Sequence, residues 1–155
     1  MGKDLSVVRL KLVKDYSINI CNEKVYGIEQ ADKIFDSFIG GSTVEKLALL
    51  CLDKHYTPIN ISLVSIGTKD NVVFCIDEIL RIALLSNSSY IIICHNHPSG
   101  NLSISELDII QTKKIGQVCK LVGIELIDSL IIGDEGRSIS IRAYIKEGVS
   151  KANGK

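Results

Sequence analysis

The chain has 155 residues, 18 basic against 18 acidic residues, and a hydrophobic fraction of 46% with only 5% aromatic residues. A chain of this length fits one domain that buries about two-thirds of its unfolded surface, here with a core of aliphatic side chains. The zero formal charge gives no support to a nucleic-acid partner, which usually requires a basic face.

The cysteines and the N-terminal residues indicate where the protein works. There are five cysteines, an odd number, and no pair has the C-x-x-C spacing. The N-terminal residues carry charges throughout and lack the apolar centre of a signal peptide, and no apolar run has the length of a membrane span. We therefore expect a cytoplasmic protein with reduced cysteines and no membrane association.

Apolar spacing predicts the elements of the first half of the chain. Residues 5–13 alternate between apolar and polar side chains and predict a strand. Residues 29–39 carry one apolar face and predict a helix. Residues 44–53 are apolar on both faces, as in a strand covered on two sides, and residues 59–66 return as a second strand after a turn.

The second half continues this alternation of strands and helices. Residues 76–85 place apolar side chains at helical spacing, and residues 104–122 predict another helix. Strands are predicted over the apolar segment 89–94 and again over 124–132 and 137–143. The order of elements predicts an α/β fold in which helices cover both faces of a sheet.

Three segments follow from this order. Residues 1–27 form an N-terminal strand and lead-in, residues 28–149 form the domain, and residues 150–155, which are small and polar, form a flexible tail. We see no internal repeat and no low-complexity linker.

The segment that carries chemistry is CHNHPSGNLSISELD, residues 94–108. His95 and His97 are two residues apart at the end of a buried strand, so both imidazoles project to the same side. Asp108 follows in the first turns of the next helix and is able to point back at them. Two histidines and one carboxylate are the protein ligands of a catalytic zinc, whose fourth position is left to water. Cys94 projects to the opposite face and is assigned to the core.

Each half of this pattern also has a purely structural explanation. His-x-His occurs by chance on surfaces, and Ser-x-x-Asp is an ordinary capping box at a helix start. The helix is predicted to begin with Ser103 or Ser105. Ser103 with Glu106 fills the capping role equally well, which leaves Ser105 and Asp108 free for the metal site.

A zinc hydrolase also needs a base that takes a proton from the zinc-bound water. Glu45 is the candidate because its charge opens an otherwise apolar strand. Glu78 is the alternative, but it lies beside Asp77 on the polar side of its helix and is predicted to be solvated.

The pattern His-x-His-Pro, six residues, then Ser-x-x-Asp resembles the JAMM metal motif of the JAB/MPN metalloproteases. The residues that match it are His95, His97, Pro98, Ser105 and Asp108. The longer string HNHPSG, with SIGT at 65–68 and Ile-Ile-Gly at 131–133, is similar to the RadC family over about residues 28–142.

The resemblance implies a JAB/MPN architecture, a mixed central sheet flanked by helices and related to the cytidine deaminases. It implies Zn²⁺ on His95, His97 and Asp108, with Glu45 as the general acid/base and Ser105 as a hydrogen-bond donor to a tetrahedral oxyanion. The implied substrate is a peptide or protein, cleaved at an amide, peptide or isopeptide bond.

The sequence departs from the RadC pattern at three places. Asp128-Ser129 stands where RadC-like chains commonly have Asp-His, and Asp77-Glu78 where they commonly have Arg-Glu. Long members begin with a helix-hairpin-helix DNA-binding segment, for which too few residues precede Glu45. The first two departures concern contacts around the site, and the third removes the main reason to expect DNA binding.

Two other functions compete with the hydrolase. The scaffold can be a weakly catalytic or non-catalytic JAB-type binding module in DNA repair or on mobile elements, although the complete ligand set argues against loss of the metal. A zinc deaminase would need H-x-E followed by P-C-x-x-C, and the sequence has neither.

Overall fold

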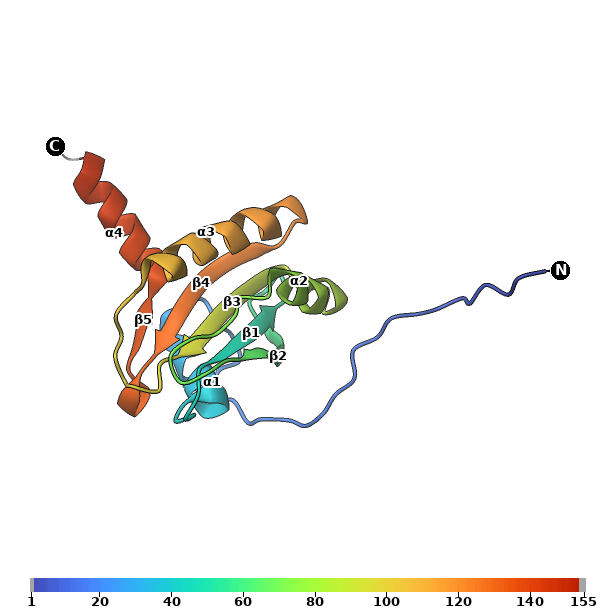
Figure 1. Cartoon of the computed structure of the whole chain (residues 1–155), viewed down its shortest axis with the longest axis horizontal. Helices are drawn as coiled ribbons and strands as arrows, with labels where there is room; N and C mark the ends of the chain where they lie inside the picture. Colours follow the sequence, from blue (N-terminus) through green and yellow to red (C-terminus); the bar gives the residue numbers. More distant parts are fainter. Residues whose placement is uncertain (1, 154–155) are drawn as a thin grey trace.

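The computed structural model describes residues 2–153, and the side chains of residues 2–148. Five strands form one sheet, with helices packed against it (Figure 1). In chain order the elements are α1 (Ile28–Ile39), β1 (Lys46–Leu52), β2 (Pro58–Ile66), α2 (Ile76–Leu85), β3 (Tyr90–Asn96), α3 (Glu106–Leu121), β4 (Glu125–Ile132), the short 3-10 turn η1 (Asp134–Gly136), β5 (Ser138–Ser140) and α4 (Ile141–Asn153).

The sheet is mixed, as expected. Its strand order is β2-β1-β3-β4-β5, with β3 and β4 parallel and every other neighbouring pair antiparallel. The strand β3 therefore lies at the centre, where Leu47 of β1 is opposite His95 and Ile131 of β4 is beside it. The end of β3 is covered by neighbours on both sides, which makes it a rigid place for functional side chains.

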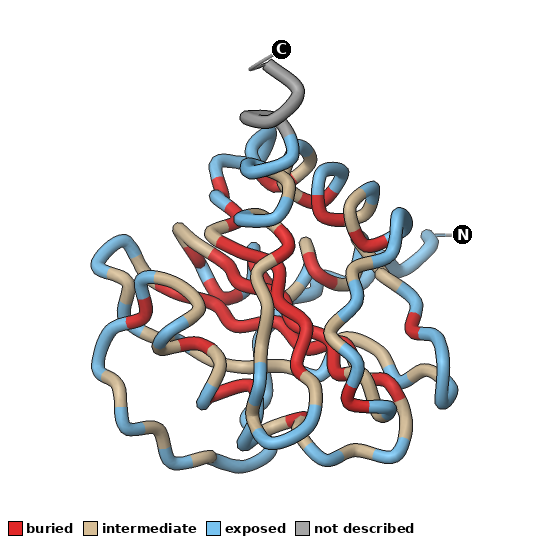
Figure 2. The backbone as a smooth tube through the Cα atoms, turned by 90° about the vertical axis from the view of Figure 1, so that its left-hand side faces the viewer, coloured by how far each residue is buried: buried red, intermediate tan, exposed pale blue. Residues whose placement is uncertain are grey.

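Two hydrophobic cores lie on opposite faces of this sheet, and the central strands β1 and β3 are buried except at their first residues (Figure 2). On one face α1 packs Phe35 against alternate residues of the strands, among them Leu50 and Ile92. On the other face α2 and α3 pack Ile79 and Ile115 against the intervening residues. Because both faces are covered, β1 and β3 are apolar at nearly every position, as the sequence predicted.

The predicted N-terminal strand over residues 5–13 is wrong. These residues form no strand, and the chain runs extended away from the domain until Ile18 and Ile20 pack on the core (Figure 1). Alternation shows that a segment suits a strand, but a strand forms only beside another strand. Within the described residues the segment has no such neighbour, and the side chain of Val7 is fully exposed.

The end of the chain also differs from its prediction. Only Ser138–Ser140 of the predicted strand 137–143 is a strand, and α4 begins directly after it. The side chain of Ser140 explains the change, because its Oγ accepts a hydrogen bond from the backbone N–H of Ala143, 3.0 Å away, as in a helix N-cap. The helix continues to Asn153, so the predicted flexible tail 150–155 is helical up to that residue and its last two residues lie outside the described chain.

None of the helices within residues 2–153 combines the length and the apolar character needed to cross a membrane.

Candidate metal centre

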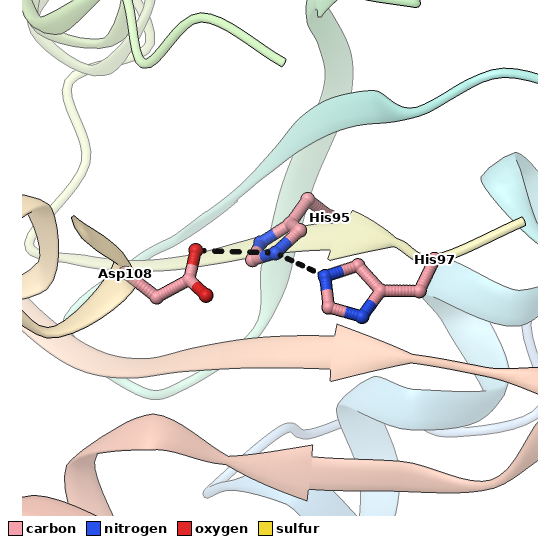
Figure 3. A group of neighbouring side chains, drawn as sticks. All are labelled: His95, His97 and Asp108. Carbon is pink, nitrogen blue, oxygen red and sulfur yellow. Dashed lines mark hydrogen bonds and ion pairs between the residues drawn. The ribbon is translucent and has the colours of Figure 1, made fainter. Parts of the chain in front are cut away.

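The two histidines converge at the C-terminal end of β3 (Figure 3). His95 lies on the strand with 2% of its surface exposed, and His97 follows just beyond the strand end. Their Nε2 atoms are 3.1 Å apart, which confirms that the i, i+2 spacing directs both rings to one side. The strand thus presents two ring nitrogens to the same point.

The ring of His97 is fixed by the loop that follows it. Its Nδ1 lies 2.6 Å from the carbonyl oxygen of Asn101, and since a carbonyl only accepts, Nδ1 carries the proton and donates it. The other nitrogen, Nε2, then keeps its lone pair toward His95. Histidine ligands of metals are commonly oriented by this kind of hydrogen bond.

His95 is held by packing instead. The ring of Phe74 meets it edge-on with centroids 5.5 Å apart. Its Nδ1 is buried and has no hydrogen-bond partner among the described residues. Nδ1 is therefore not fixed by a hydrogen bond, whereas Nε2 faces His97 and Asp108.

The third candidate ligand is Asp108, and its two carboxylate oxygens contact different residues, Ser105 and His95. Oδ2 accepts hydrogen bonds from the backbone N–H of Ser105 at 2.8 Å and from the Ser105 hydroxyl at 2.7 Å. Oδ1 faces the ring of His95, 3.4 Å from its Nε2. The start of α3 therefore fixes the carboxylate while leaving one oxygen directed at the histidines.

The capping box is consequently formed by Ser105 and Asp108, and its predicted assignment to Ser103 and Glu106 is wrong. Ser105 is the N-cap, and its Oγ accepts from the Asp108 backbone N–H at 3.1 Å. Ser103 remains in the preceding turn because its N–H is bound by the side-chain oxygen of Asn101, 2.8 Å away. The patterns Ser103-x-x-Glu106 and Ser105-x-x-Asp108 overlap in the sequence, and the turn at Asn101 to Ser103 is followed by the second of them.

The three side chains suit a single metal ion. Their ligand atoms all lie within 4.8 Å of one another. Ligands about 2.1 Å from a tetrahedral zinc are about 3.4 Å apart, since that is the edge of such a tetrahedron. The separations of 3.1 Å between the two Nε2 atoms and 3.4 Å from Nε2 to the Asp108 oxygen match this edge. Two imidazoles and one carboxylate could hold a metal and leave a fourth position free.

Glu45 lies immediately before β1, with 9% of its surface exposed. Its backbone is tied to the end of β2, since its N–H donates to the carbonyl of Thr68 and its carbonyl accepts from Gly67, both at 2.8 Å. Burial raises the pKa of the Glu45 carboxyl, a positive charge on His97 lowers it when that ring is protonated, and the carboxylates of Asp108 and Asp70 raise it. Glu45 is thus a buried carboxyl within electrostatic reach of the candidate ligands.

The alternative base, Glu78, lies on an exposed face of α2. It forms an ion pair with Arg81 at 2.7 Å, and Asp77 binds the same guanidinium at 2.9 Å. Both carboxylates are therefore engaged on the helix surface, as predicted for a solvated pair. Cys94 is fully buried among the residues of the α1 core, which agrees with its assignment to the core.

Two residues that hold this region were not identified from the sequence. Asn101 provides the carbonyl for His97, and the buried side chain of Asn96 binds the segment around Glu45. Asn96 stands between the two histidines, so its position in the motif was the available signal. At the divergent position Ser129, the hydroxyl is buried and has no hydrogen-bond partner among the described residues.

The burial of His95 predicts a pH dependence of stability in the metal-free protein. Burial, opposed by the Asp108 carboxylate and assisted by His97, lowers the pKa of His95 from 6.5 to about 4. Between these values the unfolded chain binds the proton and the folded chain does not, so lowering the pH from about 6.5 to about 4 decreases the free energy of unfolding, by up to about 3 kcal/mol.

Urea denaturation of the EDTA-treated protein across this range measures the effect, with His95→Gln as the control because its amide does not titrate. The raised pKa of Glu45 gives a slope of opposite sign in both proteins, so the comparison isolates His95. Equal slopes for the wild type and the variant would contradict the prediction.

The mixed sheet and the His-His-Asp group at its central strand end define the chain as a JAB-type α/β domain with a candidate metal centre. Comparison with known families agrees, since residues 25–147 match the family model described as the RadC-like JAB domain. The chain therefore belongs to the RadC-like JAB domain family, as the resemblance of its motifs predicted.

Curated relatives carry the name UPF0758 protein. One from Coprothermobacter proteolyticus is 36% identical over 106 residues, which is 68% of this chain and 45% of the relative. One from Methanosarcina barkeri is 40% identical over 98 residues, 63% of this chain and 42% of the relative. The chain thus spans less than half the length of these relatives, and their names state no activity.

Proposed function

We propose that the protein is a zinc-dependent hydrolase that cleaves an amide bond in a peptide or protein, as a metallopeptidase or isopeptidase. The observation that carries the proposal is the spacing of the candidate ligands. Three donor atoms, from β3, the residue after it and α3, lie within 4.8 Å of one another, at separations that suit a tetrahedral ion.

Zinc is the metal that best fits the donors. Two neutral imidazoles and one carboxylate are a common catalytic zinc set, and the low pKa of His95, about 4, keeps its ring neutral and able to bind at neutral pH. Zinc bound there would supply a Lewis acid that polarises a carbonyl group and makes a water molecule more acidic.

Glu45 is proposed as the general base. Its carboxylate would take a proton from the attacking water and then deliver it to the leaving amine as the amide bond breaks. A base works best when its pKa lies near the working pH, and burial shifts the pKa of Glu45 in that direction. Its low exposure, 9%, also limits exchange of the proton with bulk water.

Ser105 is proposed to act twice. In the structure its hydroxyl donates to Asp108 Oδ2 at 2.7 Å and so helps to hold a ligand. During hydrolysis the same hydroxyl would rotate to donate a hydrogen bond to the developing oxyanion of the substrate. This second role follows from the match to the family motif.

A peptide library tests the proposal on many candidate substrates at once. The purified protein, loaded with one equivalent of zinc, is incubated with peptides derived from a whole proteome, and mass spectrometry detects newly formed amino termini. We expect a reproducible set of cleavages that stops on addition of EDTA and returns with zinc. A folded, zinc-loaded protein that cleaves neither the peptides nor isopeptide-linked conjugates of them would contradict the proposal and favour a binding module.

A further inference from the structure

The side-chain amide of Asn96 joins β3 to the segment that carries Glu45. Its Oδ1 accepts a hydrogen bond from the backbone N–H of Lys46 at 2.8 Å, and its Nδ2 donates to the carbonyl of Val44 at 3.1 Å. These two residues flank Glu45 in the sequence. Asn96 is 3% exposed, and both of its hydrogen bonds are partly buried.

The Asn96 side-chain amide forms its hydrogen bonds just beyond the point where the backbone pairing of β1 and β3 ends. The last residue pair between β1 and β3 is Leu47 with His95. Beyond it the backbone N–H of His97 donates to Ile132 of β4 instead, and Pro98 has no N–H. The Asn96 side chain therefore provides the donor and the acceptor that a further residue of a paired strand would have provided.

The other edge of the same segment is bound by the two residues that follow β2. Glu45 donates its N–H to Thr68 and accepts from Gly67, both at 2.8 Å. With the Asn96 amide on one side and the residues after β2 on the other, the backbone around Glu45 is held in place. A side chain attached to a backbone fixed in this way has fewer positions open to it.

We infer that Asn96 is a positioning residue, which sets the distance between the Glu45 carboxylate and the His95–His97–Asp108 group. Its backbone separates the two histidine ligands, and its side chain holds the segment of the base, so one residue connects both parts of the site. The catalytic consequence of this inference rests on the proposed hydrolase function. Displacing a catalytic group by about 1 Å is sufficient to lower a rate by about 10²-fold.

Asn96→Ala tests the inference, with Asn60→Ala as a matched control. Asn60 also uses its amide to join two elements, since its Nδ2 donates to the Ser86 hydroxyl at 2.8 Å, but it lies on β2, which contributes none of the candidate ligands. If Asn96→Ala does not fold, Asn96→Leu replaces it. Leu keeps the approximate size but loses both the acceptor for Lys46 and the donor to Val44.

Four measurements on the full chain define the expected result. Zinc content stays at one per chain, and amide hydrogen exchange followed by NMR shows lost protection at Lys46 but not at Leu49 in the middle of β1. On a peptide taken from the library experiment, kcat falls at least tenfold with little change in KM. Adding Asn96→Ala to Glu45→Gln causes no further loss, because Asn96 acts through Glu45.

Several results would overturn the inference. These are unchanged protection at Lys46, a loss of zinc, an equal fall in kcat in Asn60→Ala, or a fall in kcat that multiplies with that of Glu45→Gln. If the wild type cleaves no peptide, the proposed function fails, and the exchange of the Lys46 amide in zinc-loaded protein still decides whether Asn96 holds this segment.

Discussion

Glu45→Gln is expected to lower turnover by about 10²–10⁴-fold while the zinc stays bound, because general base catalysis contributes about this much. The amide of glutamine has the same shape as the carboxylate but cannot accept a proton from water. Glu45 is not among the three candidate ligands, so the metal content is expected to remain at one per chain. Single-turnover cleavage of a library peptide measures the rate, and metal analysis of the same sample measures the zinc content.

Glu78→Gln is the matched control for this substitution. Glu78 is paired with Arg81 on the surface of α2, and an exposed pair of this kind contributes little to stability. We expect Glu78→Gln to keep the wild-type rate. A Glu45→Gln protein with full activity would show that another group acts as the base.

Zinc is expected to stabilise the fold strongly, because its proposed ligands come from two separate parts of the chain, the end of β3 with the loop after it and α3. A ligand that binds only the folded state raises the free energy of unfolding by about 4 kcal/mol when its free concentration is about 1,000 times its Kd. Urea denaturation of EDTA-treated protein, with and without added zinc, measures the difference.

Two variants separate the metal from the helix cap in this experiment. Asp108→Ala removes both a candidate ligand and one half of the capping box, so it is expected to lose the zinc effect and about 1 kcal/mol of stability without metal. Ser105→Ala removes the other half of the cap and is expected to lose a similar amount without metal while retaining most of the zinc effect. If Asp108→Ala responds to zinc as strongly as the wild type, Asp108 is not a ligand.

The grouping of the three candidate metal ligands was predictable because they lie close together in the sequence. The two-residue spacing of His95 and His97 at a strand end already places both rings on one side, and Asp108 follows within one loop and one turn. The same holds for the central strands, whose apolar residues on both faces identify a covered sheet. Such features depend on the geometry of one segment rather than on the rest of the fold.

The wrong predictions concern segments whose secondary structure depends on contacts with other parts of the chain. Residues 5–13 have the alternation of a strand, but no described strand lies beside them. Ser140 ends β5 because its hydroxyl caps α4, and a strand end and a helix N-cap both favour this residue type. Ser105 and not Ser103 is the N-cap, because the backbone N–H of Ser103 donates a hydrogen bond to the side-chain oxygen of Asn101.

The role of Asn96 depends on contacts between distant segments. Its partners are 50 and 52 residues away, at and just before the start of β1, where the backbone N–H of the next residue, His97, donates to β4. The motif HNHP draws attention to the histidines, yet the residue between them points to the other part of the proposed site. No spacing rule within a segment indicates such a contact.

Metal analysis of the wild type and of His97→Ala, purified from cells and dialysed without chelator, tests the central claim most directly. If His95, His97 and Asp108 hold zinc, the wild type contains one zinc per chain, and His97→Ala, which remains folded, contains less than about one-tenth of that. Equal metal content in the two proteins, or a folded wild type that binds no zinc even when zinc is supplied, would contradict the assignment of this site.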